Sequence, residues 1–186
     1  MDKNLIPHAL RQVPRYTSYP TAPQFSADVG AGKYRRWLAA LDPADALSLY
    51  LHVPFCREIC HYCGCHTKAS RQLAREIDLV AAALPGRMAV SHIHWGGGTP
   101  SILPATDFLR LVARLRERFD IAPAAEHAIE LDPRTVTPTL AAVLGQAGIT
   151  RASLGVQDFS EDVQRAIGRI QPFAVVRDAV AALKGA

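Results

Sequence analysis

The segment Cys56-Arg57-Glu58-Ile59-Cys60-His61-Tyr62-Cys63-Gly64-Cys65 contains all four cysteines of a chain of 186 residues. Cysteines that serve only packing are scattered through a core, so a cluster this dense indicates metal or redox chemistry. Disulfides between cysteines so close in the sequence would close very small, strained loops and would connect no distant parts of the chain. We therefore interpret the segment as a metal site.

The composition predicts a globular protein of one main domain with a small extension. The chain is 49% hydrophobic and 20% charged, and it has no uncharged apolar stretch of about 18 residues that could span a membrane. No apolar run near Met1 resembles a secretory signal, so we expect a cytoplasmic protein. We predict an N-terminal arm and helix over residues 1–45, and the main domain over residues 46–186.

The charge pattern does not indicate a nucleic-acid-binding protein. The net charge is +4, from 21 basic and 17 acidic residues, and no run of five or more basic residues occurs. A nucleic-acid interface would show a basic stripe or patch. A mild basic excess is equally suited to an anionic small molecule.

The first part of the chain is predicted to be irregular before one short helix. Four prolines fall within residues 1–29, too close together for a helix to persist. A helix is expected from Ala31, with Tyr34 and Trp37 packed in a core, and to end before Pro43.

From residue 47 onward, strand patterns alternate with helix patterns. Predicted strands cover residues 47–53, 90–95, 127–131 and 151–156. Predicted helices cover residues 70–84, 104–119, 138–146, 160–168 and 173–184, with Gly148 ending the third. Four consecutive strand–helix units predict an α/β fold with a parallel sheet wound right-handedly.

Polar and glycine-rich segments follow the predicted strands. These segments are residues 56–65, residues 96–99, Glu130 with Asp132, and Gln157 with Asp158. The carboxyl ends of parallel strands lie at one edge, where α/β folds build their sites. The sequence therefore predicts one converging site at this edge.

The cysteine spacing leaves two metal chemistries open. Cys56, Cys60 and Cys63 in a C-x3-C-x2-C pattern could hold a [4Fe–4S] cluster with one iron free of protein ligands. Zinc remains an alternative, because His61 or His66 could add a nitrogen ligand, although structural zinc sites usually draw on two separated pairs.

The C-x3-C-x2-C pattern after a first strand, with aromatic Tyr62 before the third cysteine, resembles the radical S-adenosylmethionine (SAM) superfamily. Within it, six blocks in order resemble the bacterial oxygen-independent coproporphyrinogen III oxidase family. They are residues 16–21 (YTSYPT), 50–56 (YLHVPFC), 63–65 (CGC), 94–100 (HWGGGTP), 129–134 (IELDPR) and 155–159 (GVQDF). The resemblance implies part of a radical SAM barrel of the partial TIM type.

The resemblance also implies roles for individual residues, but it leaves the catalytic residues unassigned. Three cysteines would hold the [4Fe–4S] cluster, two tyrosines would border the first SAM, and a glycine-rich loop would admit its methionine end. Glu130 would accept hydrogen bonds from the first SAM, and two further residues would contact a second SAM. The cluster ligands would be Cys56, Cys60 and Cys63, and the two tyrosines would be Tyr50 and Tyr62. The glycine-rich loop would be Gly96, Gly97, Gly98 and Thr99, and the second SAM would contact Gln157 and Arg169.

The implied reaction is the SAM-dependent radical oxidative decarboxylation of two propionates of coproporphyrinogen III to vinyl groups, giving protoporphyrinogen IX in haem biosynthesis. The family implies a monomer and an electron donor whose identity the sequence does not give. Arg11 and Arg15 are candidates for pairing with substrate carboxylates, because arginine binds carboxylate in a bidentate manner.

Two other functions remain as alternatives, a related haem chaperone and a zinc-binding module. Haem chaperones of the superfamily typically carry an aromatic residue at the position of Cys65, so Cys65 and Tyr19-Pro20 in the arm favour the oxidase. Whether Cys65 takes part in chemistry or only lines the site stays open.

The family's barrel needs about six strand–helix units and a C-terminal domain, whereas this sequence contains four units. We therefore expect an incomplete barrel that binds the cluster but does not turn over substrate.

Overall fold

The structure, a computed structural model, describes residue 24 and residues 26–56 and 73–186. Most of the predicted arm, and the segment holding Cys60, Tyr62, Cys63 and Cys65, lie outside these residues. The chain divides into two compact units, Met1–Arg35 and Arg36–Ala186. The division that we place at residue 45 stays a prediction.

Helix α2 (Ala31–Ala39) begins where the sequence predicts, but the expected burial of its aromatic residues is wrong. Tyr34 and Trp37 are 50% and 51% exposed, and α2 buries none of its nine residues. An amphipathic pattern shows which face of a helix is apolar, but not whether another element covers that face.

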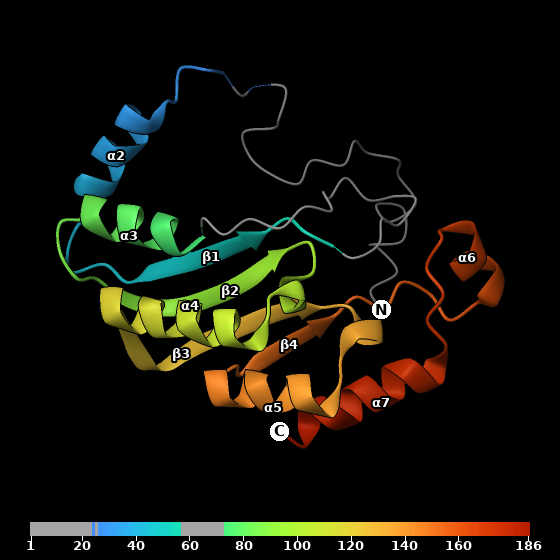
Figure 1. The fold of residues 1–186 in the computed structure, drawn as a ribbon. Helices are drawn as coiled ribbons and strands as arrows, with labels where there is room; N and C mark the ends of the chain where they lie inside the picture. Colours follow the sequence, from blue (N-terminus) through green and yellow to red (C-terminus); the bar gives the residue numbers. More distant parts are fainter. Residues whose placement is uncertain (1–23, 25, 57–72) are drawn as a thin grey trace, which may run out of the picture. The chain divides into compact units, whose positions relative to one another are not determined.

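Four parallel strands form one sheet in the order β1-β2-β3-β4, which confirms the predicted α/β architecture (Figure 1). The strands are β1 (Leu47–Val53), β2 (Ala89–Gly97), β3 (Asp120–Leu131) and β4 (Arg151–Leu154). The helices between and after them are α3 (Leu73–Ala83), α4 (Ala105–Arg118), α5 (Pro138–Ala147), α6 (Glu161–Ala166) and α7 (Phe173–Lys184). Short 3-10 turns η3 (Pro100–Ile102) and η4 (Pro133–Thr135) follow β2 and β3.

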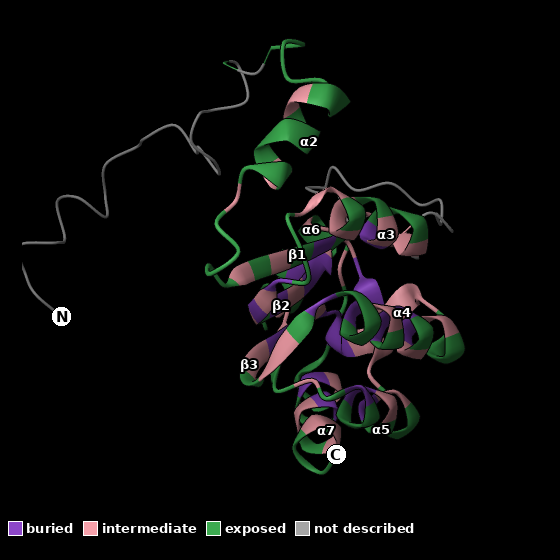
Figure 2. Ribbon diagram, turned by 90° about the vertical axis from the view of Figure 1, so that its left-hand side faces the viewer, coloured by how far each residue is buried: buried purple, intermediate pink, exposed green. Residues whose placement is uncertain are grey.

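The core lies between the sheet and the helices that cover one of its faces. In Figure 2, α3, α4, α5 and α7 lie on the same side of β1, β2 and β3. Trp95 on β2 is fully buried, is paired in register with Leu51 and Ile129, and packs its ring 4.8 Å from that of Phe108 on α4. The buried residues of α4 recur at helical spacing, as predicted: Phe108, Leu111, Val112 and Leu115.

One polar pair is buried in this core. The indole nitrogen Nε1 of Trp95 donates to Nε2 of His127 at 2.8 Å, so His127 must be neutral at that nitrogen. Burial lowers the pKa of His127 from 6.5 to about 4, a backbone hydrogen bond with Gly148 opposes the change, and the charge of Arg116 adds to it.

Among the helices of the described ranges, none is long and apolar enough to cross a membrane.

Candidate functional site

The predicted site residues that the structure describes lie at the carboxyl ends of the strands or in the segments that follow them. Because β1 to β4 are parallel, these ends meet at one edge of the sheet (Figure 1). Cys56 follows β1, Gly97 ends β2, Glu130 is the penultimate residue of β3, and Gln157 follows β4. The sheet thus supplies one edge with residues that are about 100 positions apart in the sequence.

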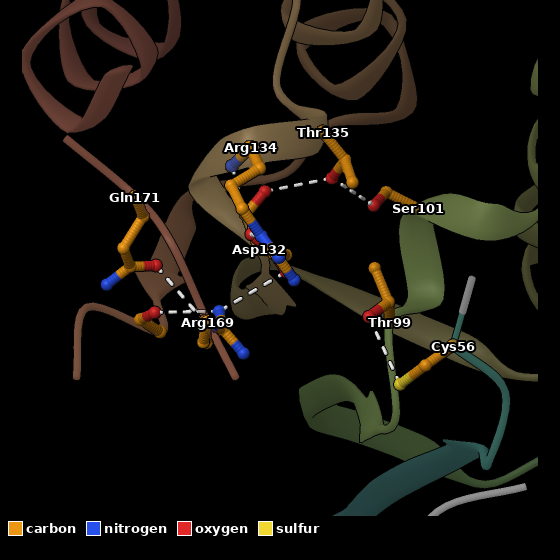
Figure 3. Close-up of polar contacts among 9 residues, drawn as sticks. Cys56, Thr99, Ser101, Asp132, Arg134, Thr135, Arg169 and Gln171 are labelled. Carbon is orange, nitrogen blue, oxygen red and sulfur yellow. Dashed lines mark hydrogen bonds and ion pairs between the residues drawn. The ribbon is translucent and has the colours of Figure 1, made fainter. Parts of the chain in front are cut away.

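The turn after β1 is bound to the glycine-rich loop after β2. The backbone N–H of Gly98 donates to the carbonyl of Val53, and that of Thr99 to the carbonyl of Phe55, both at 2.8 Å. A Cβ on Gly98 would lie 2.6 Å from the Phe55 oxygen, so only glycine allows this approach. The hydroxyl of Thr99 then donates to the sulfur of Cys56 at 3.4 Å (Figure 3).

A second group of contacts surrounds Glu130. Its Oε1 lies 3.1 Å from His94 Nε2, and its Oε2 accepts from the backbone N–H of Gly97 at 3.4 Å. The ring of Tyr50 stacks on His94 with a centroid distance of 5.5 Å. A Cβ on Gly96 would lie 2.7 Å from the Tyr50 hydroxyl and 3.0 Å from the Glu130 carboxylate, so this glycine leaves room for both groups.

A third group forms beyond β3 and β4 around Asp132. Nε and Nη2 of Arg134 donate to its two carboxylate oxygens at 2.7–3.1 Å, and Nη2 of Arg169 lies 3.3 Å from Oδ2 (Figure 3). The same Arg169 nitrogen donates to the carbonyl of Gly155 at 2.8 Å. A Cβ on Gly155 would meet Arg169 Nη2 at 3.2 Å and Gln157 Nε2 at 3.5 Å, so both donors converge over this glycine.

The charge on Asp132 is stabilised despite its burial. Burial by itself raises the pKa of this carboxyl, but the hydrogen bonds from the side chain and backbone of Arg134 and the charges of Arg169 and Arg134 outweigh burial and lower the pKa. Asp132 is therefore ionised at neutral pH and contacts two guanidinium groups.

A hydroxyl bridge joins the loops after β2 and β3. The hydroxyl of Thr135 donates to the backbone carbonyl of Asp132 at 2.8 Å, and its oxygen lies 3.1 Å from the hydroxyl of Ser101 (Figure 3). The loop that carries Thr99 and the turn that carries Asp132 are therefore tied together.

The described candidates lie in three places: Cys56 is hydrogen-bonded to Thr99, Tyr50 and Glu130 both lie close to Gly96, and Gln157 and Arg169 both lie close to Gly155. Cys60, Tyr62 and Cys63 lie outside the described residues, as do Cys65 and the arm arginines Arg11 and Arg15. Their roles, and those of the described candidates, stay predictions.

Three residues at this edge carry no role assigned from the sequence. His94 could have been found from the two-residue period of β2, in which it alternates with the buried Ile93 and Trp95. Asp132 follows a predicted strand and so was expected at this edge, but only the fold brings it and Gln171 to Arg169.

One described residue at the edge, Cys56, has the chemistry of an iron–sulfur cluster ligand. Cys56 is a free thiol, half-buried at the carboxyl end of β1, and it already accepts a hydrogen bond from a hydroxyl, as a cluster thiolate does. Thiolate sulfur is the ligand that such clusters require.

Known proteins resemble this chain over most of its length. The family model described as the Radical SAM superfamily matches residues 50–186. The chain is 49% identical over 178 residues to the oxygen-independent coproporphyrinogen III oxidase of Bradyrhizobium diazoefficiens, covering 90% of this chain and 40% of that protein. It is 43% identical over 180 residues to the protein of the same name from Paracoccus denitrificans, covering 91% and 40%.

A solved structure also resembles this chain. Coproporphyrinogen III oxidase from Escherichia coli, described as a radical SAM enzyme, superposes with a TM-score of 0.80 at 38% identity. The match covers 91% of this chain and 41% of that one. The chain therefore spans about 40% of the length of the relatives that it matches.

Proposed function

The chain belongs to the radical SAM superfamily, and from this premise we propose that it is the cluster- and SAM-binding part of an oxygen-independent coproporphyrinogen III oxidase. Membership of the superfamily implies a [4Fe–4S] cluster and SAM. One observation carries the proposal for this chain. Cys56, Thr99, Glu130 and the Gln157–Arg169 pair, which come from or follow four different strands, lie along one edge of the sheet.

The described residues support distinct binding roles. Cys56, with Cys60 and Cys63 from the sequence, would hold the cluster, and the hydroxyl of Thr99 would stabilise negative charge on the Cys56 sulfur. Glu130 is fixed by His94 and by the Gly97 N–H, yet it is 45% exposed, so its carboxylate can accept further hydrogen bonds from SAM. Tyr50 would border the SAM beside it.

We also propose the finer features of the family for the whole protein. A second SAM would bind near Gln157 and Arg169, whose side-chain nitrogens both lie close to Gly155. The substrate would be coproporphyrinogen III, and an electron donor of unknown identity would supply electrons. The cytoplasmic location and the monomeric state stay predictions.

When bound, the cluster and SAM would supply the radical chemistry by which a propionate side chain would lose carbon dioxide and become a vinyl group. This chain's residues would hold the cluster and orient the SAM. Tyr50 and His94 form a stacked pair beside Glu130.

Anaerobic reconstitution tests the proposal. The purified chain is treated with iron and sulfide, and its iron content, absorption spectrum and equilibrium binding of SAM are measured. We expect a brown protein with about four irons per chain that binds SAM. Cys56→Ala should lose the cluster, whereas Cys65→Ala, the matched control, should keep it because three thiolates suffice.

A colourless protein with stoichiometric zinc would contradict the cluster. The haem chaperone would be favoured instead if the protein binds haem tightly and forms no divinyl product. The second measurement uses the whole protein with SAM, a reductant and coproporphyrinogen III. Formation of the divinyl product by the whole protein would support the oxidase.

A further inference from the structure

His94 lies on an inner strand of the sheet, with its side chain on the face opposite to the one that packs in the core. The residues on either side of it in β2 are both buried in the core, and side chains alternate along a strand. In register, its partners are Tyr50 on β1 and Ala128 on β3. Because Ala128 carries only a methyl group, the ring has room to reach Glu130, two residues further along the same face of β3.

The contact between His94 and Glu130 has a defined donor. Nε2 of His94 lies 3.1 Å from Oε1 of Glu130, and an ionised carboxylate can only accept a hydrogen bond. The proton is therefore on Nε2, in the neutral ring and in the charged ring alike. On the side of β1, the ring of Tyr50 stacks on the imidazole with an angle of 16° between the two planes. The imidazole thus lies between the tyrosine and the carboxylate.

Both oxygens of the Glu130 carboxylate have a partner among the described residues. Oε1 has the Nε2–H of His94, and Oε2 has the backbone N–H of Gly97 at 3.4 Å, which is long for a hydrogen bond. The shorter contact, from His94, is therefore the main restraint on the carboxylate. Each carboxylate oxygen can accept two hydrogen bonds, so both oxygens can also accept one from a ligand.

The contact contributes little to the stability of the fold. The side chains of His94 and Glu130 are 37% and 45% exposed, and water screens an ion pair as open as this one. Holding two side chains in one geometry also costs conformational entropy. The arrangement is better explained by what the carboxylate binds than by what it does for folding.

We propose that His94 is a positioning residue, whose Nε2–H orients the Glu130 carboxylate to accept hydrogen bonds from SAM. The inference rests on the proposed function and deepens it. His94 acts through Glu130 and does not itself contact the ligand.

Two amide substitutions at position 94 test the inference. Glutamine reaches about as far as Nε2 and can donate from its amide, whereas asparagine ends near the position of Nδ1 and falls short of Glu130. In the cluster-loaded chain we expect His94→Asn to raise the Kd for SAM about 10-fold, as for a lost hydrogen bond to a charged group. His94→Gln should stay within about 2-fold of the parental Kd.

The matched control is His92→Asn, the same change at an exposed histidine two residues earlier on β2. It should leave the Kd for SAM unchanged. The midpoint of thermal unfolding should be nearly the same in the parental chain and in His94→Asn, because the ion pair is exposed.

Two further measurements separate positioning from direct contact with the ligand. In a Glu130→Ala background, His94→Asn should not raise the Kd for SAM any further, because a positioning residue acts only through the group that it positions. In the ligand-free chain, proton NMR should detect the Nε2–H of His94, because a hydrogen bond to a carboxylate slows its exchange with water. This signal, assigned by its absence from His94→Gln, should also disappear in Glu130→Ala.

The outcomes are distinguishable. An unchanged Kd in His94→Asn, or an equal rise in His94→Asn and His94→Gln, would overturn the inference. A further rise in the Glu130→Ala background would also overturn it, because His94 would then act independently of Glu130. Failure of the parental chain to bind SAM would overturn the proposed function instead, and the Nε2–H signal would still decide whether His94 holds Glu130.

Discussion

Lowering the pH from about 7 to about 4.5 should destabilise this protein through the buried pair Trp95–His127. The folded state keeps His127 neutral, with a pKa of about 4 instead of 6.5. Between these values the unfolded chain binds a proton that the folded state excludes, so the free energy of unfolding falls as the pH falls. Above pH 6.5 His127 is neutral in both the folded and the unfolded state, so it does not lower the free energy of unfolding.

The size of the effect follows from the two pKa values. Each pKa unit corresponds to about 1.4 kcal/mol, so the full fall from 6.5 to about 4 is about 3 kcal/mol. This is a large share of the ordinary stability of a domain, about 5–15 kcal/mol. The carboxylates of Asp78 and Asp132, whose pKa values are lowered from 3.8, lose their stabilisation as the pH falls toward and below 3.8, so they contribute only at the lower end of this window.

Urea unfolding monitored by circular dichroism at a series of pH values measures the effect. His127→Gln should remove the slope between pH 6.5 and 4, because glutamine oxygen can accept the Trp95 N–H and does not titrate. His92→Gln is the matched control at an exposed histidine and should keep the slope. A parental chain without a slope, or a slope that persists in His127→Gln, would refute the reasoning.

Three further substitutions test the site edge. Gly98→Ala should lower the free energy of unfolding by about 1–3 kcal/mol, since the new Cβ meets the backbone of Phe55, which cannot move aside alone; urea unfolding measures it. Asp132→Asn should cost about 2–3 kcal/mol by the same measurement, because two guanidiniums lose their shared carboxylate. Thr99→Val should speed iron loss from the reconstituted cluster to a chelator about 10-fold, because the Cys56 sulfur loses its hydrogen bond.

A control substitution checks the first of these predictions, and a stated result would contradict each of the other two. Gly86→Ala, where a Cβ would meet nothing within 4 Å, should leave stability unchanged, and an equal loss at Gly86 and Gly98 would contradict the steric argument. Asp132→Asn with parental stability would show that the two arginines find other partners. Iron loss at the parental rate in Thr99→Val would mean that the hydroxyl does not stabilise the thiolate.

The sequence by itself determined the order of elements and the edge where the site lies. Strand and helix periods differ, and Pro, Gly and apolar spacing mark where elements end, so local patterns were sufficient for the order of the strands and helices. The bounds were less exact, because β3 begins at Asp120 and not at residue 127, and β4 ends at Leu154 and not at residue 156. Because successive parallel strands point the same way, the residues that follow them had to share an edge. The cysteine spacing and the sequence blocks were sufficient on their own to indicate the superfamily.

Only the tertiary structure decided burial and pairing between distant residues. The apolar face of α2 predicted core packing for Tyr34 and Trp37, yet both are half exposed, since burial depends on what covers a helix. Likewise, no local pattern links Asp132 to Arg169 or Gln171 to that arginine, because these contacts arise when the loop after β3 meets the segment before α7. The cysteine segment indicates the cluster, but the fold decides which side chains orient the groups that face it.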